Sequence, residues 1–103
     1  MPGTVRMNSQ QQMCIEGDVT IDNVQEICAQ GKQLIPSMDK LIVDLSGITN
    51  ADSSCLAMLI DWVRCAGALK KPVEYTNPPR EIIDLGRVCG LDNILPIGKE
   101  LIW

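Results

Sequence analysis

The chain has 103 residues, a formal net charge of −4, 46% hydrophobic residues and 21% charged residues. This size and composition predict one globular domain, and its core must be aliphatic because aromatic residues make up only 3% and Phe is absent. The negative charge and the scattered Lys and Arg residues argue against nucleic acid as a partner.

Residue usage also argues against catalysis, metal binding and membrane insertion. His is absent, so Ser–His and Cys–His catalysis is excluded, because both need a base that titrates near neutral pH. The five cysteines are widely spaced with no Cys-x-x-Cys pair, which indicates reduced, mostly buried thiols. The longest apolar run, 55–60, is far shorter than the ~20 residues of a membrane span, and the first residues lack the layout of a signal peptide. We therefore expect a cytoplasmic protein that is not an enzyme and that needs no cofactor or metal.

The N-terminal residues, 1–12, predict a loosely ordered segment or a first strand, and the domain itself is expected over 13–103. A strand is expected to begin within 5–7 or 13–15. Residues 16–18 then indicate a turn.

A first helix is predicted after the β-favouring residues 19–21. Asp22 is placed to cap this helix, with Gln25 three residues later as the reciprocal partner. Apolar residues follow at helical spacing, and 36–37 end the pattern because they begin with Pro.

The middle of the chain predicts a strand and a second helix. Residues 41–45 are nearly all apolar, which is typical of a central strand covered on both faces in a partly parallel sheet. The pattern is helical from Asp52 to Leu69, with Asp52 available as the cap and a stop favoured by 70–72.

The last part of the chain predicts one more strand and one more helix. The strand is expected over 73–76, and Thr76 or Asn77 can cap a third helix that closes at Gly90. The tail, 91–103, is apolar enough to fold back. This alternation predicts a single α/β domain with right-handed crossovers, a mixed four- to five-stranded sheet and about three to four helices.

The second predicted helix carries two apolar stripes. At about 100° per residue, the stripe expected to cover the sheet consists of Leu56, Leu59, Ile60, Val63 and Ala66. The other stripe lies roughly 120° around the helix by the same arithmetic and consists of Cys55, Met58, Trp62, Cys65 and Leu69.

Two explanations account for the second stripe. Neighbouring helices or the tail cover it, or it is a protein-binding surface with an exposed Met58–Trp62 pair as its anchor. The change Trp62→Glu distinguishes them: it abolishes partner binding in a folded monomer if Trp62 is exposed, and it unfolds the protein if Trp62 is in the core.

Asp52, Ser53 and Ser54 open this helix, where unpaired backbone N–H groups and the helix dipole favour an anion. Phosphorylation there could switch partner binding by charge repulsion. The alternative is that both serines only cap the helix, which is the more common role of Ser at such a position.

Residues 41–48 and 52–57 together resemble the central strand and the signature helix start of STAS domains, the modules of sulfate transporters and anti-sigma-factor antagonists. The resemblance covers 16–96. It marks Asp52, Ser53 and Ser54 as phosphoacceptor-like or interface residues at the helix start. Cys55 departs from the family pattern, which has Gly before the leucine.

Residues 59–64, 75–79 and 87–96 are most similar to the MlaB branch of this family, the stand-alone STAS subunits of Mla phospholipid ABC transporters. This resemblance implies a non-catalytic cytoplasmic subunit, peripheral to the inner membrane, that binds and supports the transporter's ATPase subunit in maintaining outer-membrane lipid asymmetry. The alternative is an anti-sigma-factor antagonist switched by serine phosphorylation. A small enzyme or ligand-binding domain is a third hypothesis, and the sequence leaves a homodimer open.

Overall fold

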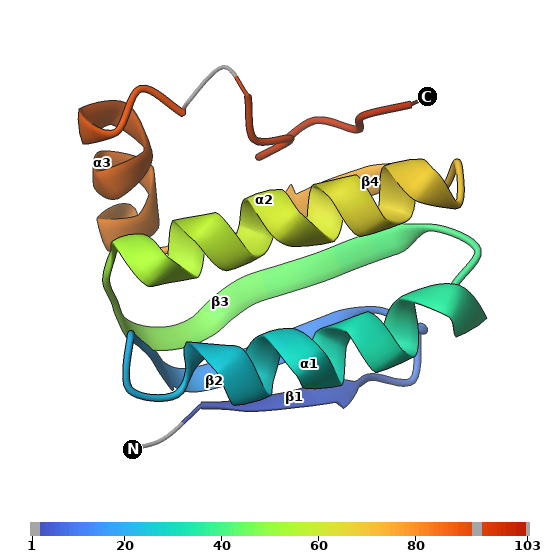
Figure 1. The fold of residues 1–103 in the computed structure, drawn as a ribbon, viewed down its shortest axis with the longest axis horizontal. Coiled ribbons are helices and arrows are strands. Elements are labelled where there is room, and N and C mark those ends of the chain that lie inside the picture. The colour runs from blue at the N-terminus through green and yellow to red at the C-terminus, as the bar shows by residue number, and fades with distance from the viewer. Residues whose placement is uncertain (1–2, 92–93, 103) are drawn as a thin grey trace.

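Strands and helices alternate along the computed structural model, which describes residues 3–91 and 94–102 (Figure 1). The strands are β1 (Thr4–Met7), β2 (Met13–Val19), β3 (Leu41–Ala51) and β4 (Val73–Thr76). The helices are α1 (Val24–Leu34), α2 (Ser53–Ala68) and α3 (Arg80–Val88), and a 3-10 turn, η1 (Ile35–Ser37), follows α1. The predicted α/β class is confirmed.

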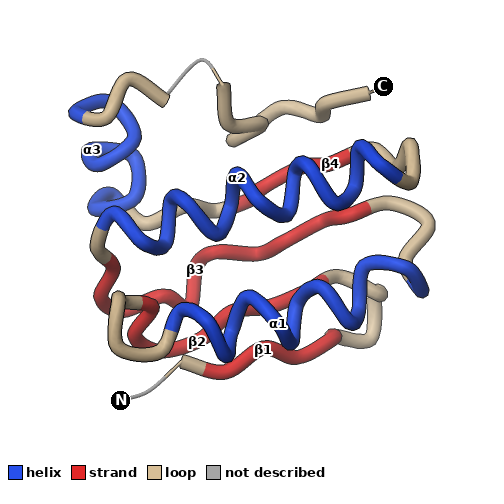
Figure 2. The backbone as a smooth tube through the Cα atoms, in the orientation of Figure 1, coloured by secondary structure: helices blue, strands red, loops and turns tan. Residues whose placement is uncertain are grey.

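The four strands form one mixed sheet in the order β1-β2-β3-β4. β1 pairs with β2 antiparallel, whereas β2 with β3 and β3 with β4 are parallel. The two parallel crossovers move in the same direction across the sheet, so crossovers of one hand place both helices on the same face. Figures 1 and 2 show α1 and α2 side by side in front of the sheet, with α3 beside the start of α2.

The central position of β3 is confirmed, but its expected coverage on both faces is wrong. Burial alternates along the apolar run, so that Ile42 and Asp44 are only half-buried while Leu41, Val43 and Leu45 are buried. The physical reason is that α1 and α2 cover the same face of the strand (Figure 1).

The expected turn at 16–18 is also wrong, because these residues lie within β2. Gly17 has a φ of 91°, and the register between β2 and β3 shifts between Gly17 and Asp18. The turn-forming glycine therefore produces an irregularity in a continuing strand.

Two predicted helix caps are replaced by other residues. Asn23 occupies the cap position of α1 in place of Asp22, and its side chain accepts a hydrogen bond from Thr20 N and donates one to Asp18 O. For α3, neither Thr76 nor Asn77 is the cap, because the helix begins only at Arg80 after Pro79. Asn77 has a φ of 54° and Pro79 is extended with a ψ of 156°, so helical backbone begins only at Arg80.

The C-terminal tail folds back as predicted, over its described part. Leu101 pairs with Val73 and Ile97 with Tyr75 in isolated bridges, and Leu95 is buried. Asp92, Asn93 and Trp103 belong to the predicted tail but lie outside the described residues.

The buried side of α2 includes members of both predicted stripes: Cys55, Leu56, Met58, Leu59, Trp62 and Ala66. Met58 is 2% exposed and Trp62 is 0% exposed, so the alternative of an exposed Met58–Trp62 anchor is wrong and the explanation by coverage holds for this pair. The reason is that α1 lies along this flank of α2 (Figure 2).

The contact between Trp62 and α1 depends on Gly31. The indole Nε1 donates a hydrogen bond to Cys28 O at 3.1 Å, so the buried N–H has a partner. A Cβ atom on Gly31 would lie 2.2 Å from Cζ2 of Trp62. The indole therefore packs directly on the backbone of α1.

All five cysteines are free: Cys14 and Cys55 are buried, Cys28 and Cys65 are half-buried, and Cys89 is exposed. Within residues 3–91 and 94–102, no helix is both long and apolar enough to cross a membrane.

The change Gly31→Ala is expected to destabilise the protein by about 1–3 kcal/mol, because the new methyl group overpacks against the Trp62 ring. This exceeds the gain of up to ~1 kcal/mol that Ala brings to a helix interior. Urea denaturation measures the change. The matched control is Gly86→Ala in α3, where no described atom beyond the adjacent residues and the helix's own backbone lies within 4 Å of the new Cβ, so this variant should be at least as stable as the wild type. A Gly31→Ala protein of unchanged stability would contradict the packing described here.

Candidate functional site

The start of α2 is held by the Asp52 carboxylate, which joins two segments distant in sequence. Oδ1 accepts a hydrogen bond from Ser54 N at 2.9 Å and another from the Ser54 hydroxyl. Oδ2 accepts a hydrogen bond from the backbone N of Ile21 at 3.0 Å. The Ser54 hydroxyl and then the Ile21 amide hold the pKa of Asp52 below its ordinary value. Asp52 therefore caps α2, as predicted, and also fixes the loop before α1.

Ser53 and Ser54 differ in accessibility. Ser54 is half-buried and its hydroxyl is engaged by Asp52, whereas Ser53 is exposed. The cap itself is Asp52. Ser53 is therefore the more accessible hydroxyl of the pair, and its phosphorylation stays a prediction.

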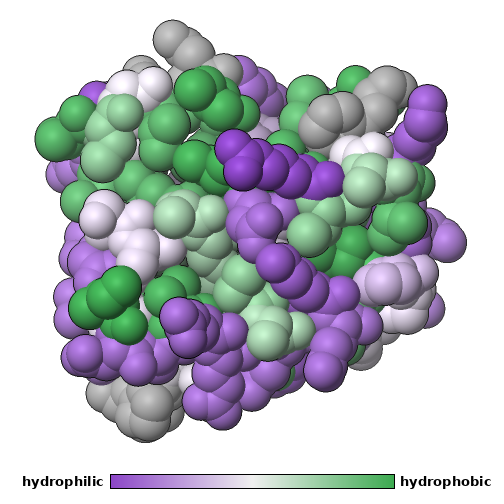
Figure 3. All heavy atoms as spheres, viewed as in Figure 1, coloured by the Kyte–Doolittle hydropathy of each residue, from purple (hydrophilic) through white to green (hydrophobic). Residues whose placement is uncertain are grey.

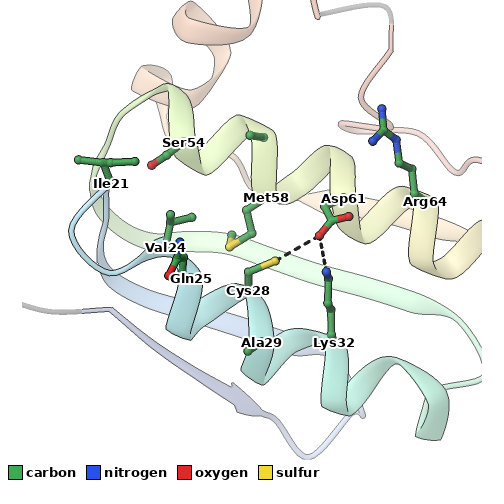
Figure 4. Close-up of a pocket in the computed structure, with 11 residues that line it drawn as sticks. Ile21, Val24, Gln25, Cys28, Ala29, Lys32, Ser54, Met58, Asp61 and Arg64 are labelled. Carbon is green, nitrogen blue, oxygen red and sulfur yellow. Dashed lines mark hydrogen bonds and ion pairs between the residues drawn. The ribbon is translucent and has the colours of Figure 1, made fainter.

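A groove of about 570 Å³ runs between α1 and α2 beside this helix start (Figure 4). We call it the α1–α2 groove. On the α1 side it is lined by Ile21, Val24, Gln25, Cys28, Ala29 and Lys32. On the α2 side it is lined by Ser54, Ala57, Met58, Asp61 and Arg64.

Small side chains from both helices line part of the groove: Cys28 and Ala29 of α1, and Ser54 and Ala57 of α2. Figure 4 shows the Cys28 thiol pointing toward Asp61, with Met58 beside it. Beneath them, Met58 is almost fully buried and supplies an apolar floor. Figure 3 shows this side of the molecule with hydrophobic areas interrupted by hydrophilic side chains.

One end of the groove is polar. Lys32 Nζ lies 2.6 Å from Oδ2 of Asp61, and the Cys28 thiol donates to the same oxygen at 3.5 Å. The hydrogen bond from Lys32 is the largest cause that lowers the pKa of Asp61. Burial, and then Asp61, raise the pKa of Cys28, so its thiol is neutral and is not activated as a nucleophile.

Lys32 and Asp61 form an ion pair at this end of the groove. Arg64 also lies at this end, but its exposed side chain points away from α1 (Figure 4). The arrangement can therefore bind an apolar surface beside a polar end whose charges are paired. No cluster suited to a metal ion occurs within the described part of the chain.

The predicted partner-binding residues are dispersed by the fold. Cys55 and Trp62 are in the core, and only Met58 lines the groove. Cys65 is half-buried, and Leu69 is 48% exposed at the end of α2. Whether these five residues bind a partner stays a prediction.

Sequence analysis missed the α1 wall of the groove. The available signal was that Val24 and Cys28 are one helical turn apart, beside the stripe of Ile27 and Gly31 that is buried. Ile21, which is 72% exposed, gave no such signal, because its place at the mouth of the groove depends on Asp52.

Comparison with known proteins gives one family match. The family model described as "Mlab, STAS domain" matches residues 4–97. Curated proteins offer no match to this chain.

Three solved structures share the fold at low sequence identity. The anti-sigma factor antagonist SpoIIAA in its unphosphorylated form is 17% identical, with a TM-score of 0.72 over 95% of this chain and 87% of that chain. A putative anti-sigma factor antagonist from Thermotoga maritima is 13% identical, with a TM-score of 0.73 over 91% and 83%. An anti-sigma-factor antagonist (STAS) domain protein from Planctomyces limnophilus is 16% identical, with a TM-score of 0.68 over 92% and 87%. At these identities the likeness shows the fold alone.

The change Asp52→Ala is expected to destabilise the protein by about 1 kcal/mol, because it removes the cap of α2. The change Asp52→Asn keeps a capping oxygen and should cost less. Because folding lowers the pKa of Asp52, the charge stabilises the fold above the unfolded pKa, and this contribution is lost as pH falls through the folded pKa. Denaturation at neutral pH and at pH about 3 should therefore show the gap between wild type and Asp52→Asn closing in acid. A gap that stays constant with pH would contradict the role of the charge.

Proposed function

Because this chain belongs to the STAS domain family, through a match of residues 4–97 to the MlaB-type model, we propose that it is the non-catalytic STAS subunit of a phospholipid ABC transporter. In this role it is cytoplasmic, binds the ATPase subunit at the inner membrane, and supports the transporter that maintains outer-membrane lipid asymmetry. STAS domains mediate protein–protein interaction, which fits a subunit that acts by binding. The observation that carries the proposal is the match to the MlaB-type model.

The proposed docking surface combines the exposed start of α2 with the α1–α2 groove. Ser53 is exposed in the first turn of α2, and Ser54 lines the adjoining groove. Asp52 ties the exposed Ile21 to the same place. One continuous surface therefore offers an apolar rim, small side chains and the exposed Ser53 at a helix start.

The alternative function is an anti-sigma-factor antagonist, and the exposed Ser53 hydroxyl in the first turn of α2 is the observation that favours it. A phosphate on that hydroxyl would add nearly two negative charges to the proposed docking surface.

Affinity purification of the tagged chain from its native cells tests the function. We expect an ATPase of the ABC class to be recovered in stoichiometric amounts, identified by mass spectrometry. The variant Ser53→Glu should lower this recovery at least about fivefold, because it places a charge at the docking surface. The matched control Ser9→Glu changes an exposed serine between β1 and β2 and should bind normally. Recovery of a serine-kinase-like anti-sigma factor in place of the ATPase would overturn the proposal.

A further inference from the structure

The outer edge of β4, on the side away from β3, is covered by the C-terminal tail (Figure 1). We propose that the tail blocks this edge, so that β4 does not pair with β4 of a second copy of the chain. The edge lies apart from the start of α2, and the inference does not depend on the proposed function.

The outer edge of β4 presents four backbone groups, which are the N–H and C=O groups of Val73 and Tyr75. Val73 N donates to Leu101 O at 3.0 Å, and Leu101 N donates to Val73 O at 2.8 Å. Tyr75 N donates to Pro96 O and Gly98 N donates to Tyr75 O, both at 3.0 Å. The tail therefore satisfies all four groups, which would otherwise be free to pair with another strand.

The tail covers the edge without becoming a regular fifth strand. Its bridge at Ile97 is parallel and its bridge at Leu101 is antiparallel, so the backbone changes course between them, where Gly98 has a φ of 70°. A regular strand would carry a new row of unpaired groups on its own outer side. An irregular segment covers the edge of β4 and offers no such row.

Side chains hold the tail in place as well. Leu95 is buried, and Ile97 and Leu101 pack against the hydrophobic core. Lys40 Nζ lies 3.1 Å from Oε1 of Glu100. The covered edge is therefore the stable arrangement of the isolated chain.

A second copy fits the uncovered edge in one symmetric register. Two antiparallel β4 strands, related by a twofold axis at Glu74, would pair Val73 of each copy with Tyr75 of the other. The N–H and C=O groups of both residues point outward, so this register makes four hydrogen bonds, as many as the tail makes. It also keeps the buried Val73 and Tyr75 side chains on one face of a continuous sheet. The tail and a second copy therefore compete for the same four groups.

Glu74 is a second barrier to this pairing. In the symmetric register the Glu74 side chains of the two copies are directly opposite each other, on the face of the sheet away from Val73 and Tyr75. Like charges at directly opposite positions destabilise a strand pair. A charge at the centre of an edge strand is one of the features that protect such edges from self-pairing.

The test breaks both tail bridges in the full chain. Gly98→Pro with Leu101→Pro removes the two N–H groups that the tail donates to β4. Sedimentation velocity measures self-association, and we expect a monomeric wild type at ~100 μM and a dimer of the double variant whose Kd is at least about tenfold lower. The matched control is Ile102→Pro, which changes an exposed residue outside both bridges and should stay monomeric.

A further change tests the register. Adding Glu74→Gln to the double variant removes the repulsion between the two copies and should lower the dimer Kd about threefold or more. Adding Glu26→Gln, an exposed glutamate of α1, makes the same change in net charge and should leave the Kd unchanged.

Hydrogen exchange locates the contact between the copies. In the double variant the amides of Val73 and Tyr75 should become more protected as protein concentration rises. The amide of Leu41, which donates to Pro72 O on the inner side of β4, should not change.

A double variant that is folded by circular dichroism and stays monomeric would overturn the inference. A dimer that leaves the amides of Val73 and Tyr75 unprotected, or a wild-type chain that already dimerises through these amides, would overturn it as well. If the double variant does not fold, Leu101→Ala decides, because it removes only the packing of one tail side chain. This variant should self-associate more strongly than the wild type, and unchanged self-association would count against the blocking role of the tail.

Discussion

The packing of Trp62 against Gly31 sets the distance between α1 and α2, and the groove depends on that distance. The indole is fully buried, its N–H is satisfied by Cys28 O, and only a glycine leaves room for it on α1. Protein interiors are close-packed, so a ring that packs directly on the backbone of the facing helix limits how closely the two helices approach. Above the ring, the facing side chains are too small to close the gap. The groove therefore depends on the buried Trp62, because the same two helices that enclose the indole form the walls of the groove.

A second constraint acts at the start of α2. Asp52 accepts hydrogen bonds from Ser54 and from Ile21. Ile21 lies 31 residues before Asp52 in the sequence. One carboxylate thus caps a helix and places an exposed aliphatic side chain beside it. The family signature at this helix start has a structural role that stands apart from any modification of Ser53 or Ser54. A surface that combines this fixed rim with the adjoining groove suits recognition of a protein partner.

Local signals were sufficient where one segment determined its own structure. The strand at Val73–Thr76, the cap at Asp52 and the central apolar strand followed from patterns within a few residues. Turn chemistry at Gly17 was misleading, because pairing of β2 with β3 outweighed the local preference for a turn. Periodicity located the apolar stripes of α2 but could not show their coverage, because the burial of Trp62 requires Gly31 on another helix. The groove could not be predicted from the sequence for the same reason, because its walls come from two different helices.

The central proposal is that the chain binds the ATPase of an ABC transporter through the start of α2 and the α1–α2 groove. Site-specific photo-crosslinking tests it most directly. A photoreactive residue is placed at Ile21, at the mouth of the groove, or at Val88, an exposed aliphatic residue of α3 that is 85% exposed. A crosslink to the ATPase is expected from position 21 and none from position 88. A crosslink from position 88 with none from position 21 would contradict it.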